Sequence, residues 1–236
     1  MVLIIGHRGA RNLWPENSLE GFRRTRDLGV DAVEFDVHLS QDGELVVIHD
    51  PSLERTTEGT GPVAERTARD LDAMGVPSLE AVLDVYAGTP IELHIEIKTD
   101  ALGRAYDGLE QRLLDMIAKC RLQQQAIVTS FVPEILETVR KLSPSQRVLA
   151  SLDRRSAELF GGLPAALDRF AVIGNCMVAV EKGLLADSLD LCLRRVGGDN
   201  LGAWVPNEAD DIAQWLARPI RQITTDRPDV ALALRR

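Results

Sequence analysis

Short apolar runs alternate with amphipathic segments along almost the whole chain. The runs predict strands at residues 2–6, 32–37, 91–98, 126–131, 147–152, 170–175, 200–205 and 220–225. The segments between them carry apolar residues at helical spacing. This rhythm is typical of a parallel sheet with helices outside it. Eight such strands predict the α/β class and a closed (β/α)8 TIM barrel. A doubly wound open sheet is the alternative.

Two of the predicted helices can be described by their apolar faces. In residues 18–29, Leu19, Phe22 and Leu28 can share one face, with Asn17 or Ser18 as the N-cap. In residues 78–88, four residues fall at helical spacing and Gly88 is a plausible cap. These four are Leu79, Val82, Leu83 and Tyr86.

One apolar run does not fit the alternation of strands and helices. The stretch "LVVIHD" (45–50) follows "VEFDV" too closely for a parallel crossover. Asp42-Gly43 between them is a strong signal for a hairpin turn, so residues 33–49 are interpreted as one antiparallel hairpin. Folding about this turn pairs Asp36 with a position at or next to His49. Residues 50–77 form a small cap. We therefore expect a single domain, 1–236, with an insertion after the second strand at about 38–77.

Alternation along the strands predicts an unusual amount of charge inside the barrel. The apolar positions of "VEFDV" should meet the helices, so Glu34 and Asp36 should point inward. In the strand at 91–98 the same argument turns four polar side chains inward. These are Glu92, His94, Glu96 and Lys98. Barrel interiors are normally filled by branched apolar residues, so these groups require an explanation.

Three of the inward carboxylates, Glu34, Asp36 and Glu96, should lie near one rim of the barrel. Burying unpaired carboxylates is costly, so this set needs a cation. Three oxygen ligands predict a divalent metal, Mg²⁺ or Ca²⁺, and are a poor match for zinc. The alternative is that Glu34 and Asp36 form internal salt bridges with Lys98 and Arg8.

Two histidines should border the same rim as the carboxylates. His7 ends the first strand, and His49 ends the hairpin partner of the second. Two imidazoles that titrate near neutrality can act in turn as general base and general acid. Of the other two histidines, His94 is interpreted as a satisfied interior residue, with contact to the site as the alternative. His38 is expected to point away from the carboxylates and to be solvated.

Composition and charge exclude several classes of function. The formal net charge is −9, which argues against a general binder of nucleic acid or of anionic membranes. An anionic small substrate remains compatible, because local cations or a metal can reverse the field in one pocket. Cys120, Cys176 and Cys192 form no CxxC pair and are expected to be buried thiols in a reducing compartment. Without a signal peptide or an apolar run long enough to span a membrane, we expect a soluble, cytoplasmic protein.

Several motifs, taken together, resemble the glycerophosphodiester phosphodiesterase family of the PLC-like phosphodiesterase superfamily. They run in the family's order from residue 6 to residue 229, and the first two are highly specific together. The motifs are "GHRGARNLWPENSLEGF", "VEFDVHLSQDGELVVIHDPSLERTTEGTG", "VPSLEAVL", "LHIEIK", "TSF", "GAWVPN" and "ITTDRPD". The resemblance implies a TIM barrel with a small insertion after the second strand.

The resemblance also implies an activity and a set of site residues. The expected reaction is metal-dependent hydrolysis of a small glycerophosphodiester to an alcohol and sn-glycerol 3-phosphate. His7 and His49 would be the acid–base pair, and Glu34, Asp36 and Glu96 would hold the divalent metal. Arg8 and Lys98 would contact phosphoryl oxygens, and Trp204 would lie near the glycerol site. The stretch "WVPN" departs from the family's W-T-V-N at Val205 and Pro206, and Pro206 removes a backbone donor there.

Three other functions are compatible with parts of the sequence. A related enzyme could use the same barrel and metal on lysophospholipids or sphingolipids, as a lysophospholipase D or phospholipase D. A binder without activity would lack a histidine or a metal ligand, and none is missing here. A sugar-phosphate barrel enzyme would hold its phosphate on glycine-rich amides late in the chain, where "VGGDNLG" (196–202) is the only hint.

Overall fold

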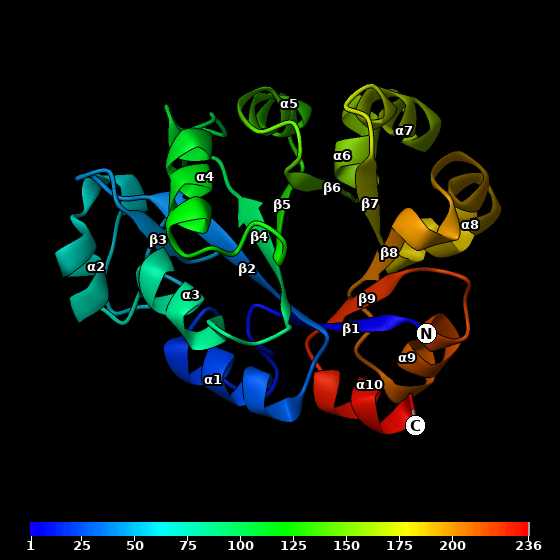
Figure 1. Cartoon of the computed structure of the whole chain (residues 1–236), viewed down its shortest axis with the longest axis horizontal. Helices are drawn as coiled ribbons and strands as arrows, with labels where there is room; N and C mark the ends of the chain where they lie inside the picture. The colour runs from blue at the N-terminus through cyan, green and yellow to red at the C-terminus, as the bar shows by residue number, and fades with distance from the viewer. Residues whose placement is uncertain (236) are drawn as a thin grey trace.

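Eight parallel strands close into a ring in the computed structural model, which describes residues 1–235 (Figure 1). The order around the ring is β1-β9-β8-β7-β6-β5-β4-β2, and pairing of β1 with β2 closes it. The helices lie around the outside of the strands. The predicted (β/α)8 barrel is therefore confirmed, and the open doubly wound sheet is excluded.

The strands are β1 (Leu3–His7), β2 (Ala32–Leu39), β3 (Leu45–Val47), β4 (Glu92–Ile97), β5 (Ala126–Ser130), β6 (Arg147–Leu152), β7 (Cys176–Glu181), β8 (Leu201–Trp204) and β9 (Gln222–Thr225). The α-helices are α1 (Leu19–Leu28), α2 (Ala68–Ala73), α3 (Leu79–Tyr86), α4 (Leu109–Lys119), α5 (Pro133–Leu142), α6 (Arg154–Leu159), α7 (Leu163–Ala171), α8 (Lys182–Val196), α9 (Ala209–Leu216) and α10 (Pro228–Leu234). Two 3₁₀ turns, η1 (Val63–Glu65) and η2 (Gly198–Asn200), complete the set.

The ninth strand, β3, lies outside the ring and pairs antiparallel with β2. The register pairs Val37 with Val47, and the amide of Ile48 donates to the carbonyl of Asp36 at 3.1 Å. The predicted hairpin is thus present, with a shorter ladder than residues 33–49. Its register places His49 one position beyond the residue opposite Asp36, as the turn at Asp42-Gly43 predicts.

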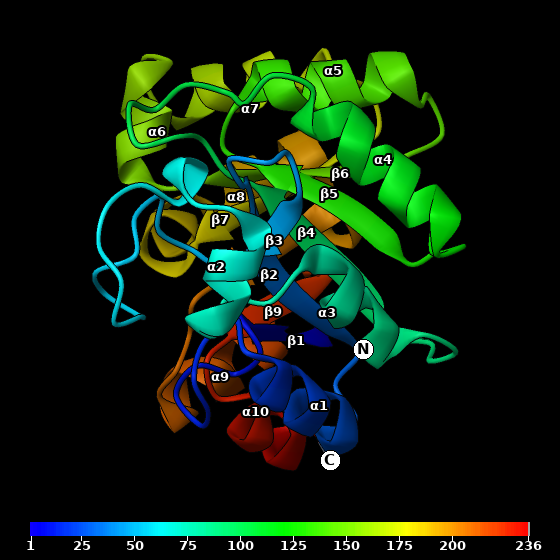
Figure 2. The ribbon, with the colours of Figure 1, turned by 90° about the vertical axis from the view of Figure 1, so that its left-hand side faces the viewer.

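The segment that follows β3 packs on a small apolar cluster of its own, outside the barrel. Its fully or nearly buried members are Val46, Ile48, Leu53, Val63, Leu71 and Val76. Figure 2 shows α2 beside β2 and β3, with the long loop before it extending to the left. The main core lies instead between the strands and the surrounding helices.

One predicted strand is wrong. Residues 170–175 do not form a strand, because Phe170 and Ala171 end α7 and the chain then turns through Gly174 (φ +70°) and Asn175 (φ +47°). The seventh barrel strand is β7, which begins at Cys176. Phe170 is fully buried on the same helix face as Leu163, Ala166 and Leu167. A short apolar run cannot by itself distinguish the end of a buried helix from a strand.

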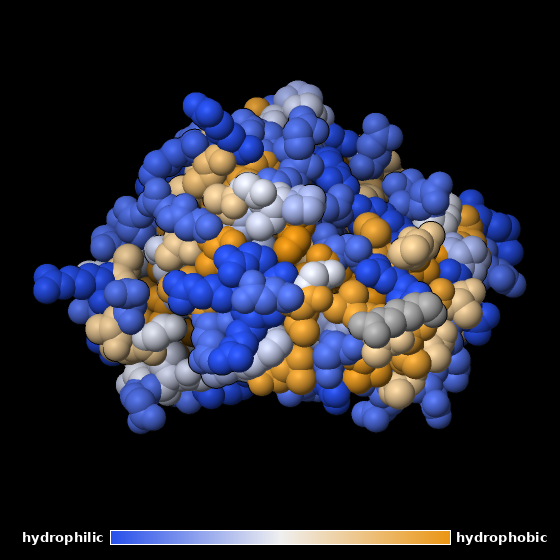
Figure 3. All heavy atoms as spheres, turned by 60° about the horizontal axis from the view of Figure 1, so that its bottom comes forward, coloured by the Kyte–Doolittle hydropathy of each residue, from blue (hydrophilic) through white to orange (hydrophobic). Residues whose placement is uncertain are grey.

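The two helices described from their apolar faces both form. Ser18 is the N-cap of α1 and accepts from the amide of Gly21 at 3.0 Å. Leu28 does not share the buried face of α1, since it is 37% exposed. In α3 all four predicted core residues are buried, and Gly88 follows with φ +74°. Figure 3 shows the side of the molecule that lies lowest in Figure 1, where α1 and α10 are; hydrophobic atoms there lie among hydrophilic ones.

The two edges of the barrel differ in their chemistry. At the edge where strands begin, Glu92 accepts from Arg147 at 2.8 Å and from Arg221 at 2.6 Å. Because β4 is adjacent to neither β6 nor β9, these pairs cross the barrel interior. The glycine-rich stretch at 196–202 precedes β8 and so lies at this edge, opposite the edge where His7 ends β1. It is therefore misplaced for a phosphate site at the edge that holds His7.

The three cysteines and the lengths of the helices can also be compared with the expectations from sequence. Cys120, Cys176 and Cys192 are all free thiols, and only Cys192 is buried. Among residues 1–235, no helix combines the length and the apolar character that crossing a membrane requires.

Candidate active site

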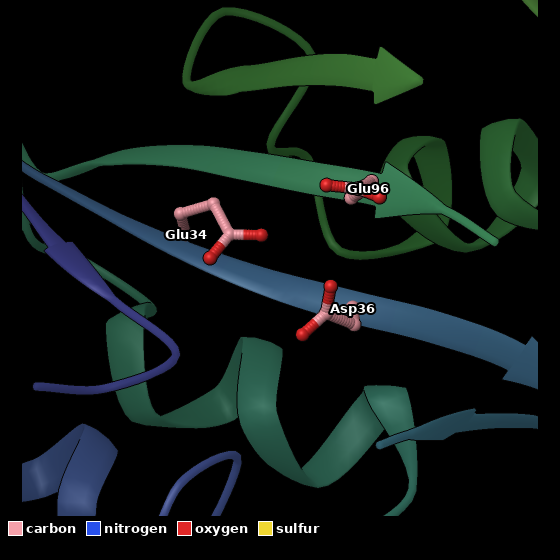
Figure 4. Close-up of side chains that lie close together, drawn as sticks. All are labelled: Glu34, Asp36 and Glu96. Carbon is pink, nitrogen blue, oxygen red and sulfur yellow. The ribbon is translucent and has the colours of Figure 1, made fainter. Parts of the chain in front are cut away.

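Three carboxylates converge where β2 and β4 lie side by side (Figure 4). Glu34 and Asp36 occupy alternate positions of β2, and the register places Glu96 of β4 beside Asp36. One oxygen from each of the three lies within 4.8 Å of the other two. Glu34 and Asp36 are buried and Glu96 is partly buried. Strand alternation alone accounts for this convergence, because it turns these positions to the same side of the sheet.

Two cations neutralise part of this charge. Lys98 Nζ lies 2.6 Å from Glu96 Oε1 and 3.1 Å from Asp36 Oδ1, and Arg8 Nε lies 3.4 Å from Asp36 Oδ2. Burial would raise the pKa of Asp36, but Lys98 and Arg8 hold it well below its ordinary value. The alternative of internal salt bridges with Lys98 and Arg8 thus holds for Asp36, and Glu96 also pairs with Lys98.

Glu34 is not neutralised in the same way. Among residues 1–235 it has no lysine or arginine within ion-pair distance, and its oxygen only accepts from the Arg8 amide at 3.2 Å. Burial and the charges of Asp36 and Glu96 raise the pKa of Glu34 well above its ordinary value. A divalent cation among the three oxygens would remove this imbalance. The all-oxygen donor set fits such an ion.

His7 stands at the rim of the barrel with its ring held by Asp226. Nδ1 of His7 donates to Asp226 Oδ1 at 2.6 Å, and Nε2 lies 3.7 Å from Glu34 Oε2. Asp226 also accepts from Arg11 Nε at 2.8 Å and from Asn207 Nδ2 at 2.7 Å. Burial, aided by the charge of Arg8, lowers the pKa of His7 although Asp226 opposes the shift. The ring is therefore oriented, with the proton on Nδ1 and Nε2 free.

The ring of His49 is also held by an aspartate, in this case Asp50. Its Nδ1 donates to Asp50 Oδ1 at 2.6 Å, and Asp50 accepts from Arg55 Nε at 2.6 Å. Arg55 in turn donates to Glu16, which also accepts from Arg8 at 3.3 Å. Burial, with the charges of Lys98 and Arg8, lowers the pKa of His49, while Asp36 opposes the shift. In both histidines Nδ1 is engaged by an aspartate, and within residues 1–235 neither Nε2 has a hydrogen-bond partner; both side chains line the same cavity.

The local chain between β1 and α1 is unusually constrained. Arg8 (φ +49°) and Ala10 (φ +65°) adopt the left-handed region that favours glycine, as does Gly9 between them (φ +73°). A Cβ on Gly9 would lie 3.1 Å from the ring of Phe22, so this turn packs tightly against α1. Asn17 (φ +53°) then brings its side-chain amide to Asp36 Oδ2 at 2.9 Å. This turn therefore brings both Arg8 and Asn17 to the same oxygen of Asp36, Oδ2.

The prediction for His38 is wrong. Its side chain is fully buried, on the same side of β2 as Asp36, and it is bonded to Tyr106 and to the main chain of His49. Positions 34, 36 and 38 have the same parity, so alternation places all three on one face. Burial lowers the pKa of His38 to about 4. His94 is buried as well and lines the central cavity, and its Nε2 has no hydrogen-bond partner among the described residues.

The predicted site residues surround one cavity of about 280 Å³. Trp204 borders it beside Phe131, with ring centroids 5.7 Å apart, and donates from Nε1 to the Ala179 carbonyl at 3.2 Å. Val205 also lines the cavity, and the peptide bond between Trp204 and Val205 is cis. Of the eight predicted site residues, all but Asp36 line the cavity, namely His7, Arg8, Glu34, His49, Glu96, Lys98 and Trp204. Asp36 lies directly behind them, in contact with Lys98 and Arg8.

Sequence reasoning did not assign the partners of the two histidines. Asp226 lies in "ITTDRPD" and Asp50 in "VVIHD", both within motifs quoted above, but a motif does not show which atoms meet. Arg11 and Asn207, which hold Asp226, were also missed. The only available signal for Asp50 was its place next to His49.

Comparisons with known proteins identify the family to which this chain is similar. A model of the glycerophosphoryl diester phosphodiesterase family matches residues 7–230. A glycerophosphodiester phosphodiesterase from Bacillus subtilis is 30% identical over 97% of this chain and 85% of that protein. Another from Caldanaerobacter subterraneus subsp. tengcongensis is 32% identical over 62% of this chain and 65% of that protein.

Solved structures share the fold. The glycerophosphodiester phosphodiesterase of Thermotoga maritima is 21% identical, with a TM-score of 0.81 over 100% of this chain and 99% of that one. An Oleispira antarctica phosphodiesterase solved with its product sn-glycerol-3-phosphate is 20% identical, with a TM-score of 0.79 over 98% of this chain and 96% of that one. At this level of identity the likeness establishes the barrel.

Proposed function

The chain belongs to the glycerophosphoryl diester phosphodiesterase family, and we propose that it hydrolyses glycerophosphodiesters to an alcohol and sn-glycerol 3-phosphate. One observation carries this proposal. Two histidines, each oriented through Nδ1 by an aspartate, flank a buried cluster of three carboxylates around one cavity. The relatives named above support the same reaction. The product found in the Oleispira antarctica phosphodiesterase supports a small-molecule substrate.

His7 and His49 act as the acid–base pair. Burial lowers the pKa of each ring, so each can accept a proton near neutral pH. The approach of an anionic diester favours the protonated form of a neighbouring ring, which can then donate. One histidine removes a proton from the nucleophile, which is water or the adjacent glycerol hydroxyl. The other gives a proton to the leaving alcohol oxygen.

Arg8 and Lys98 bind the phosphoryl group. Both line the cavity, and both keep their charge because Asp36 and other carboxylates raise the pKa of each against the effect of burial. Their charges offset the negative charge that the non-bridging oxygens carry in the transition state. Trp204 offers an apolar wall on the opposite strands, where the carbon skeleton of glycerol can pack.

Glu34, Asp36 and Glu96 would hold one divalent cation, Mg²⁺ or Ca²⁺. Bound there, the ion would supply Lewis-acid stabilisation of the charge on the phosphoryl group. The excess negative charge of the three carboxylates over their cationic partners supports this assignment.

The test is release of glycerol 3-phosphate from glycerophosphocholine and glycerophosphoethanolamine. It is run in EDTA, then with Mg²⁺ or Ca²⁺ restored, beside His49→Ala and the exposed control Lys119→Ala. We expect metal-dependent release that His49→Ala lowers by about 10²- to 10⁴-fold and Lys119→Ala leaves unchanged. Absence of release by the folded, metal-loaded wild-type protein overturns the proposal.

A further inference from the structure

His38 connects a loop at the mouth of the barrel to the main chain of His49. The ring is fully buried at the end of β2. Its Nδ1 lies 2.8 Å from the hydroxyl of Tyr106, and its Nε2 lies 3.1 Å from the carbonyl oxygen of His49. The rings of His38 and Tyr106 meet edge to face, with centroids 5.7 Å apart and an interplanar angle of 90°. His38 and His49 also line the same groove beside the central cavity.

The direction of the two hydrogen bonds follows from their partners. A carbonyl oxygen can only accept, so Nε2 of His38 carries the proton and donates to His49. In a neutral ring the other nitrogen is an acceptor, so Nδ1 accepts from the hydroxyl of Tyr106. The carbonyl of His49 therefore sets the tautomer of His38, and the Tyr106 hydroxyl satisfies the other ring nitrogen and holds the ring in place.

The hydrogen bond from His38 to the His49 carbonyl lies where the main chain leaves the ladder of β2 and β3. The last described ladder bond joins the Ile48 amide to the Asp36 carbonyl, and the next residue is His49. The side-chain bond of His49 goes to Asp50, its neighbour in the chain, and it reaches Arg8 only indirectly, through Arg55 and Glu16. The side chain of His49 is 30% exposed, and burial alone does not hold it. The bond from His38 links His49 directly to the strand that carries Glu34 and Asp36.

We propose that His38 and Tyr106 are positioning residues that hold His49 at its working distance from the carboxylate cluster. This inference rests on the proposed function, because it assigns His49 a role in the reaction. Positioning matters because a displacement of about 1 Å at a reacting group can cost about 10²-fold in rate. Tyr106 lies in the segment between β4 and α4, so it acts from outside the catalytic strands.

The experiment compares kcat and KM for glycerol 3-phosphate release in four variants and the wild type. His38→Leu removes both hydrogen bonds, while His38→Gln keeps an amide donor for the His49 carbonyl and an acceptor for Tyr106. Tyr106→Phe removes the hydroxyl and keeps the ring. The matched control is Tyr86→Phe, because the chain has two tyrosines and Tyr86 donates to the Phe22 carbonyl at 3.1 Å in the core behind α1.

We expect His38→Leu to lower kcat by about 10- to 100-fold with KM changed by less than about 3-fold. His38→Gln should restore kcat to within about 3-fold of the wild type, and Tyr106→Phe should lower it by about 3- to 10-fold. Tyr86→Phe should affect thermal stability alone. Wild-type kcat in both His38→Leu and Tyr106→Phe, or an equal loss in His38→Gln and His38→Leu, overturns the inference.

A second readout does not depend on activity. The protein has four histidines, so a long-range ¹H–¹⁵N spectrum resolves their tautomers and His38→Gln assigns one of them. We expect the proton of His38 on Nε2 in the wild type, and a proton on Nδ1 instead overturns the inference even where His38→Leu does not fold. An inactive wild-type protein counts against the proposed function, whereas an active wild type with an equally active His38→Leu counts against positioning alone.

Discussion

His7 and Asp226 are 219 positions apart in the chain, yet Nδ1 of His7 donates to Oδ1 of Asp226 at 2.6 Å. The barrel closure brings them together, since β1 and β9 are neighbours and the register pairs Gly6 with Thr225. His7 follows Gly6 and Asp226 follows Thr225, so the two residues lie next to each other at the ends of β1 and β9. Arg11 and Asn207 hold Asp226 from two further directions, so the aspartate is itself fixed. Closure of the ring is therefore what brings His7 and Asp226 into contact.

Asp226→Asn should lower kcat for glycerol 3-phosphate release by about 10²-fold or more, with KM little changed. An amide can present its NH₂ group to Nδ1 and so favour the tautomer with the proton on Nε2, which cannot act as a base. Asp229→Asn is the control, because Asp229 pairs with Arg227 and touches no histidine. Steady-state kinetics of both variants checks this, and wild-type kcat in Asp226→Asn contradicts the role given to the aspartate.

Arg8→Lys should lower kcat/KM by about 10-fold or more, although the charge is kept. The planar guanidinium lies between Glu16 and Asp36 and can offer two parallel donors to a phosphate, which an ammonium cannot. Arg24→Lys is the matched control, because Arg24 is exposed and pairs with Glu20 on the surface of α1. Equal kcat/KM in both variants shows that point charge is sufficient at position 8.

If Glu34, Asp36 and Glu96 bind a divalent cation, adding that cation should raise the Tm of the protein. In the wild type, Mg²⁺ or Ca²⁺ at 100 times its Kd should stabilise the folded protein by about 2.7 kcal/mol relative to EDTA. Glu34→Gln removes one of three ligands, so most of this metal-induced rise in Tm should be lost. Glu80→Gln, which alters an exposed carboxylate paired with Lys119, should keep it. A metal-induced shift of the same size in Glu34→Gln means that the cation binds elsewhere.

Local rules predicted the carboxylate cluster, because alternation along β2 and β4 and the turn at Asp42-Gly43 are properties of neighbouring residues. The same rules failed at 170–175, where an apolar stretch belongs to a helix end. They also missed the bond between His7 and Asp226, which depends on closure of the whole ring. His38 is a third case. Its parity with Asp36 could be read from the sequence, but its hydrogen-bond partner Tyr106 comes from a loop 68 positions away.

Glu92 should make stability depend on pH at the edge of the barrel opposite the active site. Burial by itself would raise its pKa, but His94 and the guanidinium groups of Arg221 and Arg147 lower it below the ordinary 4.5. A carboxylate with a depressed folded-state pKa stabilises the protein above the unfolded value of 4.5, and this contribution is lost as the pH falls further. The wild type should therefore lose stability on acidification below about pH 4.5, partly through Glu92.

Glu92→Gln removes this charge and leaves two arginines in the barrel interior without their acidic partner. We expect a loss of about 2–4 kcal/mol in the free energy of unfolding at pH 7. The loss should be smaller at pH 3, because the carboxyl of Glu92 is then mostly protonated in the unfolded chain and its charge in the folded protein contributes less to stability. Glu80→Gln should cost less than about 1 kcal/mol at either pH, because its pair with Lys119 is exposed. Urea unfolding at the two pH values measures both effects. A Glu92→Gln penalty that is equal at pH 7 and pH 3 means that the side chain contributes by packing and hydrogen bonding, since only a charge on Glu92 makes the difference depend on pH.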